Sequence, residues 1–369
     1  MIEIEHDFSG TFEYERYAEV VNRIKDFERW EIFGKDQSGT YDMYFISLGN
    51  VEKPVMMLMT SMHGTEWQPV QYTMYFMEQL RDNTFPDVNF RNELLENYHI
   101  IFVPMLNPHG MDRADTGEYG IYTSGNYDAR YNANGIELNG DFYPFNEQES
   151  RNMKKLQERF TPFTFVDMHM YQPDYGVAYG RRAIMASGQQ NIEGYQNATL
   201  KYRNEWKNSL ENYMGEEITS WSNLLGETSG LARGFFGRQE NPYTKFTLSY
   251  ITELPRPAYR NREGEMKLIR LLTNEEIYKY GFAHVYLFFK TSMMYYEENE
   301  GTGSTNNDFK DLVNRIEMEH KTIFLERDDE GLLLSYTEEY DETCNNMIIE
   351  TELLRNEKGY LKDVIRTKN

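Results

Sequence analysis

The sequence has one cysteine, few basic residues and no long apolar run, and each shortage excludes a class of protein. Because Cys344 is the only cysteine, no internal disulfide framework can form, and we interpret it as a small, partly buried side chain rather than a catalytic thiol. Lys and Arg number 38 against 60 Asp and Glu, for a net charge of −22. The basic surface that nucleic-acid binding requires is therefore missing.

The chain also lacks the features of a membrane or secreted protein. No segment approaches the ~18 consecutive apolar residues of a membrane span. Residues 1–7 are acidic and do not form the basic-then-apolar pattern of a signal peptide. We therefore expect no membrane association, and a protein that stays in the cytoplasm or is exported without a signal peptide, for example with a virion.

Short apolar runs suited to buried strands alternate with helical patterns. The strand-like runs are 30–33, 41–48, 54–60, 99–104, 163–168 and 247–252, and the helical patterns are 11–27, 68–80, 146–160, 192–213 and 263–279. This alternation predicts a three-layer α/β/α sandwich around a mixed, largely parallel sheet.

A polar, glycine-containing linker is expected at 297–307. We place a catalytic domain at 1–300 and a small β-rich C-terminal module at 308–369, with strands at 322–326, 332–337 and 347–353. This module could mediate oligomerisation or bind a protein partner.

Two histidines and a glutamate stand where predicted strands end. His63 and Glu66 follow the run 54–60, and their spacing lets both side chains reach one ion from a strand-to-helix turn. His169 follows the run 163–168, so the sheet edge where α/β proteins bind ligands is implicated twice. Two imidazoles and one carboxylate can hold zinc while leaving one position open to water.

Two further carboxylates accompany this set. Asp167 lies two residues before His169 on the same side of the strand, and either orients an imidazole or serves as a turn carboxylate. Glu253 ends another apolar run. A buried glutamate beside a metal is costly unless it is paired or catalytic, so Glu253 is a candidate proton acceptor.

Five motifs, in this order, resemble those of the zinc carboxypeptidases of the M14 family. They are His63-Gly-Thr-Glu66, Asn107-Pro-His-Gly110, Asn134-Gly-Ile-Glu-Leu-Asn139, Asp167-Met-His169 and Thr252-Glu-Leu254. The resemblance covers approximately residues 10–295 and leaves out the C-terminal module. A structural cluster without metal would require five motifs to match by chance, and we set that alternative aside.

The resemblance implies one zinc ion bound by His63, Glu66 and His169, the ligand set of carboxypeptidase A. It also implies that Glu253 is the general base and acid, and that Arg130 stabilises the oxyanion, although Arg113 lies in the same loop. Glu137 stands where the family usually has an Asp that hydrogen-bonds a ligand histidine. Asn139 is implied to bind substrate.

One departure concerns the residue after Asn139. The family usually carries an Arg there that clamps the substrate's terminal carboxylate, and this chain has Gly140. Gly140 cannot replace that Arg, and we expect the following Asp141 to repel a carboxylate.

A second departure is a missing mobile Tyr in the region 223–230, for which Tyr243 or Tyr250 could substitute. In the family's specificity loop, Arg233 or Arg238 could accept an acidic group on the substrate. Exposed loop arginines are the simpler interpretation.

Two functions remain open. The first is a zinc-dependent amide or peptide hydrolase with an atypical substrate, a peptide or N-acyl amino acid, possibly with an acidic group. The second is a weak or inactive carboxypeptidase-like domain used for binding or assembly, as in a virion tail or cell-surface complex. The 29 tyrosines, the C-terminal module and the lost Arg fit this second function.

Overall fold

The computed structural model describes most of the chain. The described residues are 14–114, 127–171, 183–187, 195–215, 225–226, 231–237, 241–244, 246–255, 258–260, 266–268, 274–303, 315–318, 321–327, 333–340, 347–355 and 361–368. Cys344, Arg238 and most of 223–230 lie outside them. Within the described part, no helix is long and apolar enough to cross a bilayer.

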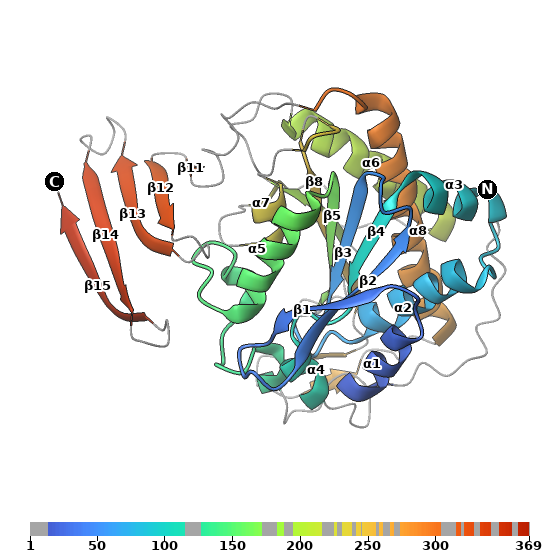
Figure 1. Cartoon of the computed structure of the whole chain (residues 1–369), viewed down its shortest axis with the longest axis horizontal. Helices are drawn as coiled ribbons and strands as arrows, with labels where there is room; N and C mark the ends of the chain where they lie inside the picture. Colours follow the sequence, from blue (N-terminus) through green and yellow to red (C-terminus); the bar gives the residue numbers. More distant parts are fainter. Residues whose placement is uncertain are drawn as a thin grey trace.

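An eight-stranded mixed sheet forms the centre of the larger part of the molecule (Figure 1), with strand order β1-β2-β4-β3-β5-β8-β6-β7. The neighbouring strands β4, β3, β5 and β8 are parallel, whereas β1, β2 and β6 add antiparallel pairs. The strands are β1 (Trp30–Lys35), β2 (Asp42–Gly49), β3 (Val55–Thr60), β4 (His99–Val103), β5 (Thr164–Tyr171), β6 (Ala183–Ser187), β7 (Leu225–Gly226) and β8 (Leu248–Pro255).

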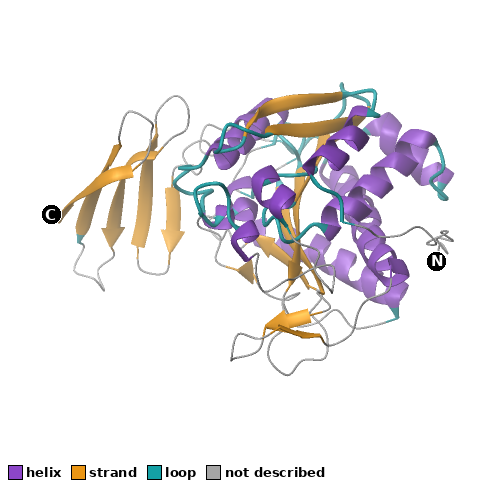
Figure 2. Ribbon diagram, turned by 90° about the horizontal axis from the view of Figure 1, so that it is seen from below, coloured by secondary structure: helices purple, strands orange, loops and turns teal. Residues whose placement is uncertain are grey.

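Helices cover both faces of this sheet (Figures 1 and 2). One face carries α1 (Tyr17–Lys25), α2 (Gln68–Asp82), α3 (Val88–Asn97), α6 (Tyr195–Met214) and α8 (Asn274–Asn299), and the other carries α5 (Gln148–Phe160) and α7 (Ala232–Phe236). Strand β3 is buried throughout because its alternate side chains enter two cores. Met56 and Leu58 join the first core, and Met57 and Met59 join the second.

The three-layer α/β/α sandwich predicted from the sequence is confirmed, and four predicted buried strands are found as β3, β4, β5 and β8. The helix predicted over 263–279 is wrong at Met266–Leu268. These residues form β10, which pairs with β9 (Ala258–Arg260), and α8 begins only at Asn274. Pairing between strands here outweighs local helix propensity. Helix α8 then continues through Asn299, into the predicted linker.

Helix α3 was not predicted, although the sequence contains a residue typical of a helix start. The side chain of Asp87 accepts a hydrogen bond from the backbone N–H of Phe90 at 3.0 Å. An aspartate in this position is a common N-terminal helix cap.

The C-terminal part forms its own five-stranded antiparallel sheet. The predicted strands correspond to β12 (Lys321–Arg327), β13 (Leu333–Tyr340) and β14 (Ile348–Arg355), while β11 (Arg315–Met318) and β15 (Leu361–Lys368) were not predicted. The domain boundary at 300–308 stays a prediction.

Glu149, in the first turn of α5, is a buried carboxyl group whose pKa differs between the folded and unfolded chain. It accepts hydrogen bonds from the backbone N–H of Gln37 (3.1 Å) and the side-chain amide of Asn132 (3.3 Å). Burial nevertheless raises its pKa to about 7 from 4.5. Between pH 4.5 and about pH 7, the carboxyl group of Glu149 is therefore protonated in the folded state and ionised in the unfolded chain. This contribution to stability is complete below pH 4.5 and is lost as the pH rises through 7.

We predict that Glu149→Gln removes this part of the pH dependence. Between pH 4 and pH 8, the free energy of unfolding of the variant should rise relative to wild type by on the order of 3 kcal/mol. Urea unfolding at several pH values measures the difference. Glu158→Gln, at an exposed position on the same helix, is the control and should show no such trend. A constant difference for Glu149→Gln across this range would contradict the prediction.

Candidate metal centre and catalytic residues

Three neighbouring parallel strands end at the candidate site. In the ladder of β3, β5 and β8, Met59 pairs with Asp167 and His169 pairs with Glu253. Paired residues lie side by side, so Glu253 is next to His169 at the carboxyl edge of the sheet. His63 follows β3 at the same edge. The edge predicted from the sequence is the one where these side chains gather.

The side chains of His63, Glu66 and His169 converge on one point and are buried. Glu66 Oε1 lies 2.9 Å from His63 Nδ1, and Glu66 Oε2 lies 3.0 Å from His169 Nδ1. The two Nδ1 atoms are 3.2 Å apart. A donor set of two nitrogens and a carboxylate, with all ligand atoms within 4.8 Å of one another, fits a zinc ion.

The other ring nitrogen of each histidine faces a carboxylate. His63 Nε2 lies 2.6 Å from Glu137 Oε1, and His169 Nε2 lies 2.7 Å from Asp167 Oδ2. The contact with Glu137 favours a proton on His63 Nε2 and leaves the Nδ1 lone pair of that ring for a metal. His169 Nε2 and Asp167 are close, but their atoms are not in hydrogen-bonding geometry. Both roles considered for Asp167 therefore stay predictions.

The electrostatics of this cluster favour a cation. Burial lowers the pKa of His169, but the negative charges of Asp167 and Glu66 outweigh burial and raise it well above the usual value. Burial, together with the charges of Glu66 and Asp167, raises the pKa of Glu253 well above that of an ordinary glutamate. Glu253 Oε2 is buried and has no hydrogen-bond partner among the described residues. A bound metal ion would compensate these carboxylates.

Backbone packing explains the glycines of the first two motifs. A Cβ on Gly64 would lie 2.0 Å from the carbonyl carbon of Gly110, and a Cβ on Gly110 would lie 2.4 Å from the oxygen of Ala129. Asn107 caps α4 (Pro108–Arg113) by accepting from Gly110 N–H at 2.8 Å, and its amide donates to the carbonyl of Arg130 at 3.3 Å. The Asn107 motif therefore holds the segment that carries Arg130 against the metal-binding turn.

Arg130 reaches the site, whereas Arg113 does not. Arg130 Nε donates to Glu137 Oε2 at 2.7 Å, and its Nη1 lies 3.5 Å from Glu66 Oε1. Arg113 instead contacts His109 at 2.9 Å in an exposed position. Burial opposes ionisation of Glu137, but the hydrogen bond from His63 and the charge of Arg130 lower its pKa to about 2. Glu137 thus joins the candidate ligand His63 to Arg130. The family resemblance implied its contact with a histidine, whereas its contact with Arg130 was not predicted.

A family model described as zinc carboxypeptidase, peptidase M14, matches residues 34–259, more than half of the chain. The chain belongs to the zinc carboxypeptidase family. The match ends before the C-terminal sheet and includes every candidate site residue.

Solved structures of carboxypeptidases share the fold at low sequence identity. The putative carboxypeptidase A from Shewanella denitrificans OS-217 is 18% identical over 76% of this chain and 69% of its own, with a TM-score of 0.54. Carboxypeptidase A from Helicoverpa armigera is 18% identical over 79% of this chain and 75% of its own, with a TM-score of 0.54. The metallo-carboxypeptidase from Burkholderia cenocepacia is 14% identical over 75% of this chain and 68% of its own, with a TM-score of 0.55. No curated protein matches the chain.

In this zinc carboxypeptidase fold, the side chain of Asp141 points in a different direction from the one expected from the sequence. Its carboxylate is buried and turns toward α5, where it accepts from the backbone N–H of Asn146 (2.9 Å) and Glu147 (2.8 Å) and from the hydroxyl of Ser150. The expectation that Asp141 repels a substrate carboxylate is therefore wrong. Gly140 is exposed, and a Cβ there would meet no described atom within 4 Å.

Arg233 is not the exposed loop arginine that the simpler interpretation predicted. It lies in α7 and is buried. Two residues further along α7, Phe235 packs against Phe142 and Phe145, with ring centroids 6.2 and 5.1 Å apart. Helix α7 is thus attached to the segment that follows Gly140.

Neither tyrosine considered as a replacement for the mobile Tyr is at the metal centre. Tyr250 is buried in the core, and its hydroxyl donates to the carbonyl of Thr199 at 3.5 Å. Tyr243 lines a surface pocket of about 710 Å³ with Val55 and His99, the first residues of β3 and β4. It therefore lies at the opposite edge of the sheet from the metal ligands.

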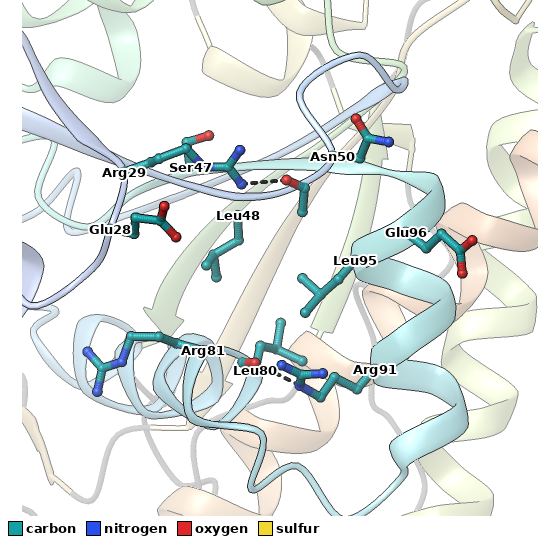
Figure 3. Close-up of a pocket in the computed structure, with 11 residues that line it drawn as sticks. Glu28, Arg29, Ser47, Leu48, Asn50, Leu80, Arg81, Arg91, Leu95 and Glu96 are labelled. Carbon is teal, nitrogen blue, oxygen red and sulfur yellow. Dashed lines mark hydrogen bonds between the residues drawn. The ribbon is translucent and has the colours of Figure 1, made fainter.

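A second pocket at this opposite edge, of about 430 Å³, is drawn in Figure 3. Leu48, Leu80 and Leu95 form its apolar side, and Arg91 is held by the carbonyl of Leu80 at 2.8 Å. None of the candidate site residues lines either pocket.

We predict that Glu137→Ala weakens zinc binding about 10–100-fold, because His63 loses the partner that orients its ring. Competition with a chromogenic chelator measures the affinity. Glu96→Ala, an exposed carboxylate on α3, controls for the loss of one negative charge and should bind zinc as the wild type does. An unchanged affinity in Glu137→Ala would remove the orienting role.

Proposed function

We propose that this protein is a zinc-dependent hydrolase of an amide or peptide bond. The supporting observation is the convergence of His63 Nδ1, His169 Nδ1 and Glu66, with Glu253 paired to His169 in the neighbouring strand. Family membership supports the same reaction class.

His63, Glu66 and His169 would hold the zinc ion. When bound, zinc supplies a Lewis acid that polarises a carbonyl and lowers the pKa of a water. Glu253 would take a proton from the attacking water and give it to the leaving nitrogen. Arg130, held by Glu137, supplies a positive charge for the developing oxyanion.

The substrate is proposed to differ from an ordinary peptide C-terminus. Gly140 stands where the family resemblance places the carboxylate-binding Arg, and the space beside it is open to a larger group. The backbone N–H of Asn139 donates to Glu137 Oε1 at 3.3 Å, and this hydrogen bond keeps Asn139 close to His63. At that position Asn139 would contact substrate. Arg233, on the adjoining α7, would accept an acidic group. A modified or cell-wall peptide and an N-acyl amino acid are the two substrate classes that fit.

The alternative is a domain that binds or assembles without catalysis. The separate C-terminal sheet is the observation in its favour. Zinc content distinguishes the two functions: less than one zinc per chain after purification without chelators would favour assembly.

We predict that Glu253→Gln lowers kcat about 10³-fold and leaves one zinc per chain bound, because the amide cannot accept the proton. The assay uses the best substrate from a panel of free and amidated peptides and N-acyl amino acids. Glu28→Gln, at an exposed position, is the matched control. Retained turnover in Glu253→Gln would exclude Glu253 as the base.

We further predict that Gly140→Arg increases release of a single C-terminal residue from unblocked peptides at least about tenfold in kcat/KM. The new guanidinium would bind the terminal carboxylate, and the open space admits it. Gly140→Met, which adds a long side chain without a charge, separates the effect of charge from that of bulk and should show no gain. If the unmodified enzyme already releases such residues rapidly, the inference from Gly140 is wrong.

A further inference from the structure

The C-terminal sheet has a covered face and an open face. On β14, Ile349 and Thr351 are buried, whereas the alternating Ile348 and Glu350 are exposed. Directly paired residues of an antiparallel ladder lie on the same face. Tyr336 pairs with Thr351 and therefore belongs to the covered face.

The covered face touches the α/β part at Tyr143. The ring centroids of Tyr143 and Tyr336 are 6.4 Å apart in an edge-to-face arrangement, a geometry that stabilises aromatic pairs. Figures 1 and 2 show this sheet standing to one side of the α/β part. The contact joins the C-terminal sheet to the segment that begins at Gly140.

That segment is firmly held on both sides of Tyr143. Phe142 and Phe145 are buried against Phe235 of α7. The carboxylate of Asp141 accepts two backbone hydrogen bonds at the start of α5. The backbone on both sides of Tyr143 is therefore held by the core, and Tyr336 packs against a side chain from this held segment.

The same segment begins beside the metal ligands. Glu137 Oε1 contacts His63 Nε2, and the carbonyl of Glu137 accepts the N–H of Gly140 at 3.2 Å. Tyr143 is the third residue after Gly140, so the two are at most ~10 Å apart along the chain. A chain of about three residues extending past Gly140 could cover the same distance.

We propose that Tyr143 and Tyr336 bind the part of the substrate that leaves after cleavage, where it extends past Gly140. The C-terminal sheet then makes this enzyme selective for leaving groups several residues long. In this role Tyr336 determines specificity and takes no part in the chemistry. The proposal rests on the proposed hydrolase function and names the kind of substrate that this function acts on.

The test measures binding to the zinc-loaded full chain by calorimetry. The probes are two acetylated alanine peptides with a phosphinate in place of the scissile amide, carrying one or four residues on the leaving side. Wild type should bind the longer probe about tenfold more tightly. Tyr336→Ala should reduce this preference to about twofold or less, and Tyr336→Phe, which keeps the ring, should retain it.

Thr337→Ala is the matched control, because Thr337 is the next residue on β13 and pairs with Glu350 on the open face. It should keep the wild-type preference. If Tyr336→Ala does not fold, Tyr143→Leu removes the other ring and should give the same loss.

The outcomes separate this proposal from the function on which it rests. Equal binding of both probes by wild type, or an unchanged preference in Tyr336→Ala, would overturn the proposal and leave the hydrolase function standing. Failure of both probes to bind the zinc-loaded protein would also overturn this proposal, whereas the hydrolase function is tested separately by the turnover of Glu253→Gln.

Discussion

The parallel pairing of β5 with β3 on one side and β8 on the other is the constraint on which the site depends. It sets Asp167 beside Met59 and His169 beside Glu253, so residues far apart in the sequence share one height at one sheet edge. Successive side chains of a strand point to opposite faces. A slip of one residue in β8 would therefore turn Glu253 away from His169. The chemistry needs the exact register, which the buried apolar residues on both faces enforce.

Charge is the second constraint. Glu66, Asp167 and Glu253 are all buried within one cluster, and buried carboxylates without compensation are costly. His169 and Arg130 compensate part of this charge. Glu137 connects two of these groups, since its oxygens face His63 on one side and Arg130 on the other. The candidate metal ligand His63 and Arg130 are consequently parts of one hydrogen-bonded unit.

The sequence predicted the architecture from local patterns, and it predicted the residues that gather at the site from those patterns together with the resemblance of five motifs. Apolar runs that end in His63, His169 and Glu253 are visible without a structure. Contacts made by tertiary packing were not predictable. Nothing in the residue types shows that Asp141 faces α5 instead of the substrate, that Arg233 is buried, or that Arg130 meets Glu137. The short pairing of Met266–Leu268 with Ala258–Arg260 was missed for the same reason, since strand pairing leaves little trace in one segment alone.

The inward orientation of Asp141 has a consequence for how this fold can change. The turn after Gly140 is stabilised by its own carboxylate and by aromatic residues that point into the core, so its shape does not depend on the side chain at 140. That position can gain or lose a carboxylate-binding group while the metal ligands and Glu253 stay where the sheet holds them. If the proposed function holds, substrate choice and bond cleavage are carried by structural parts that can vary separately, and exchange of a single residue would adapt the same candidate metal centre to another substrate.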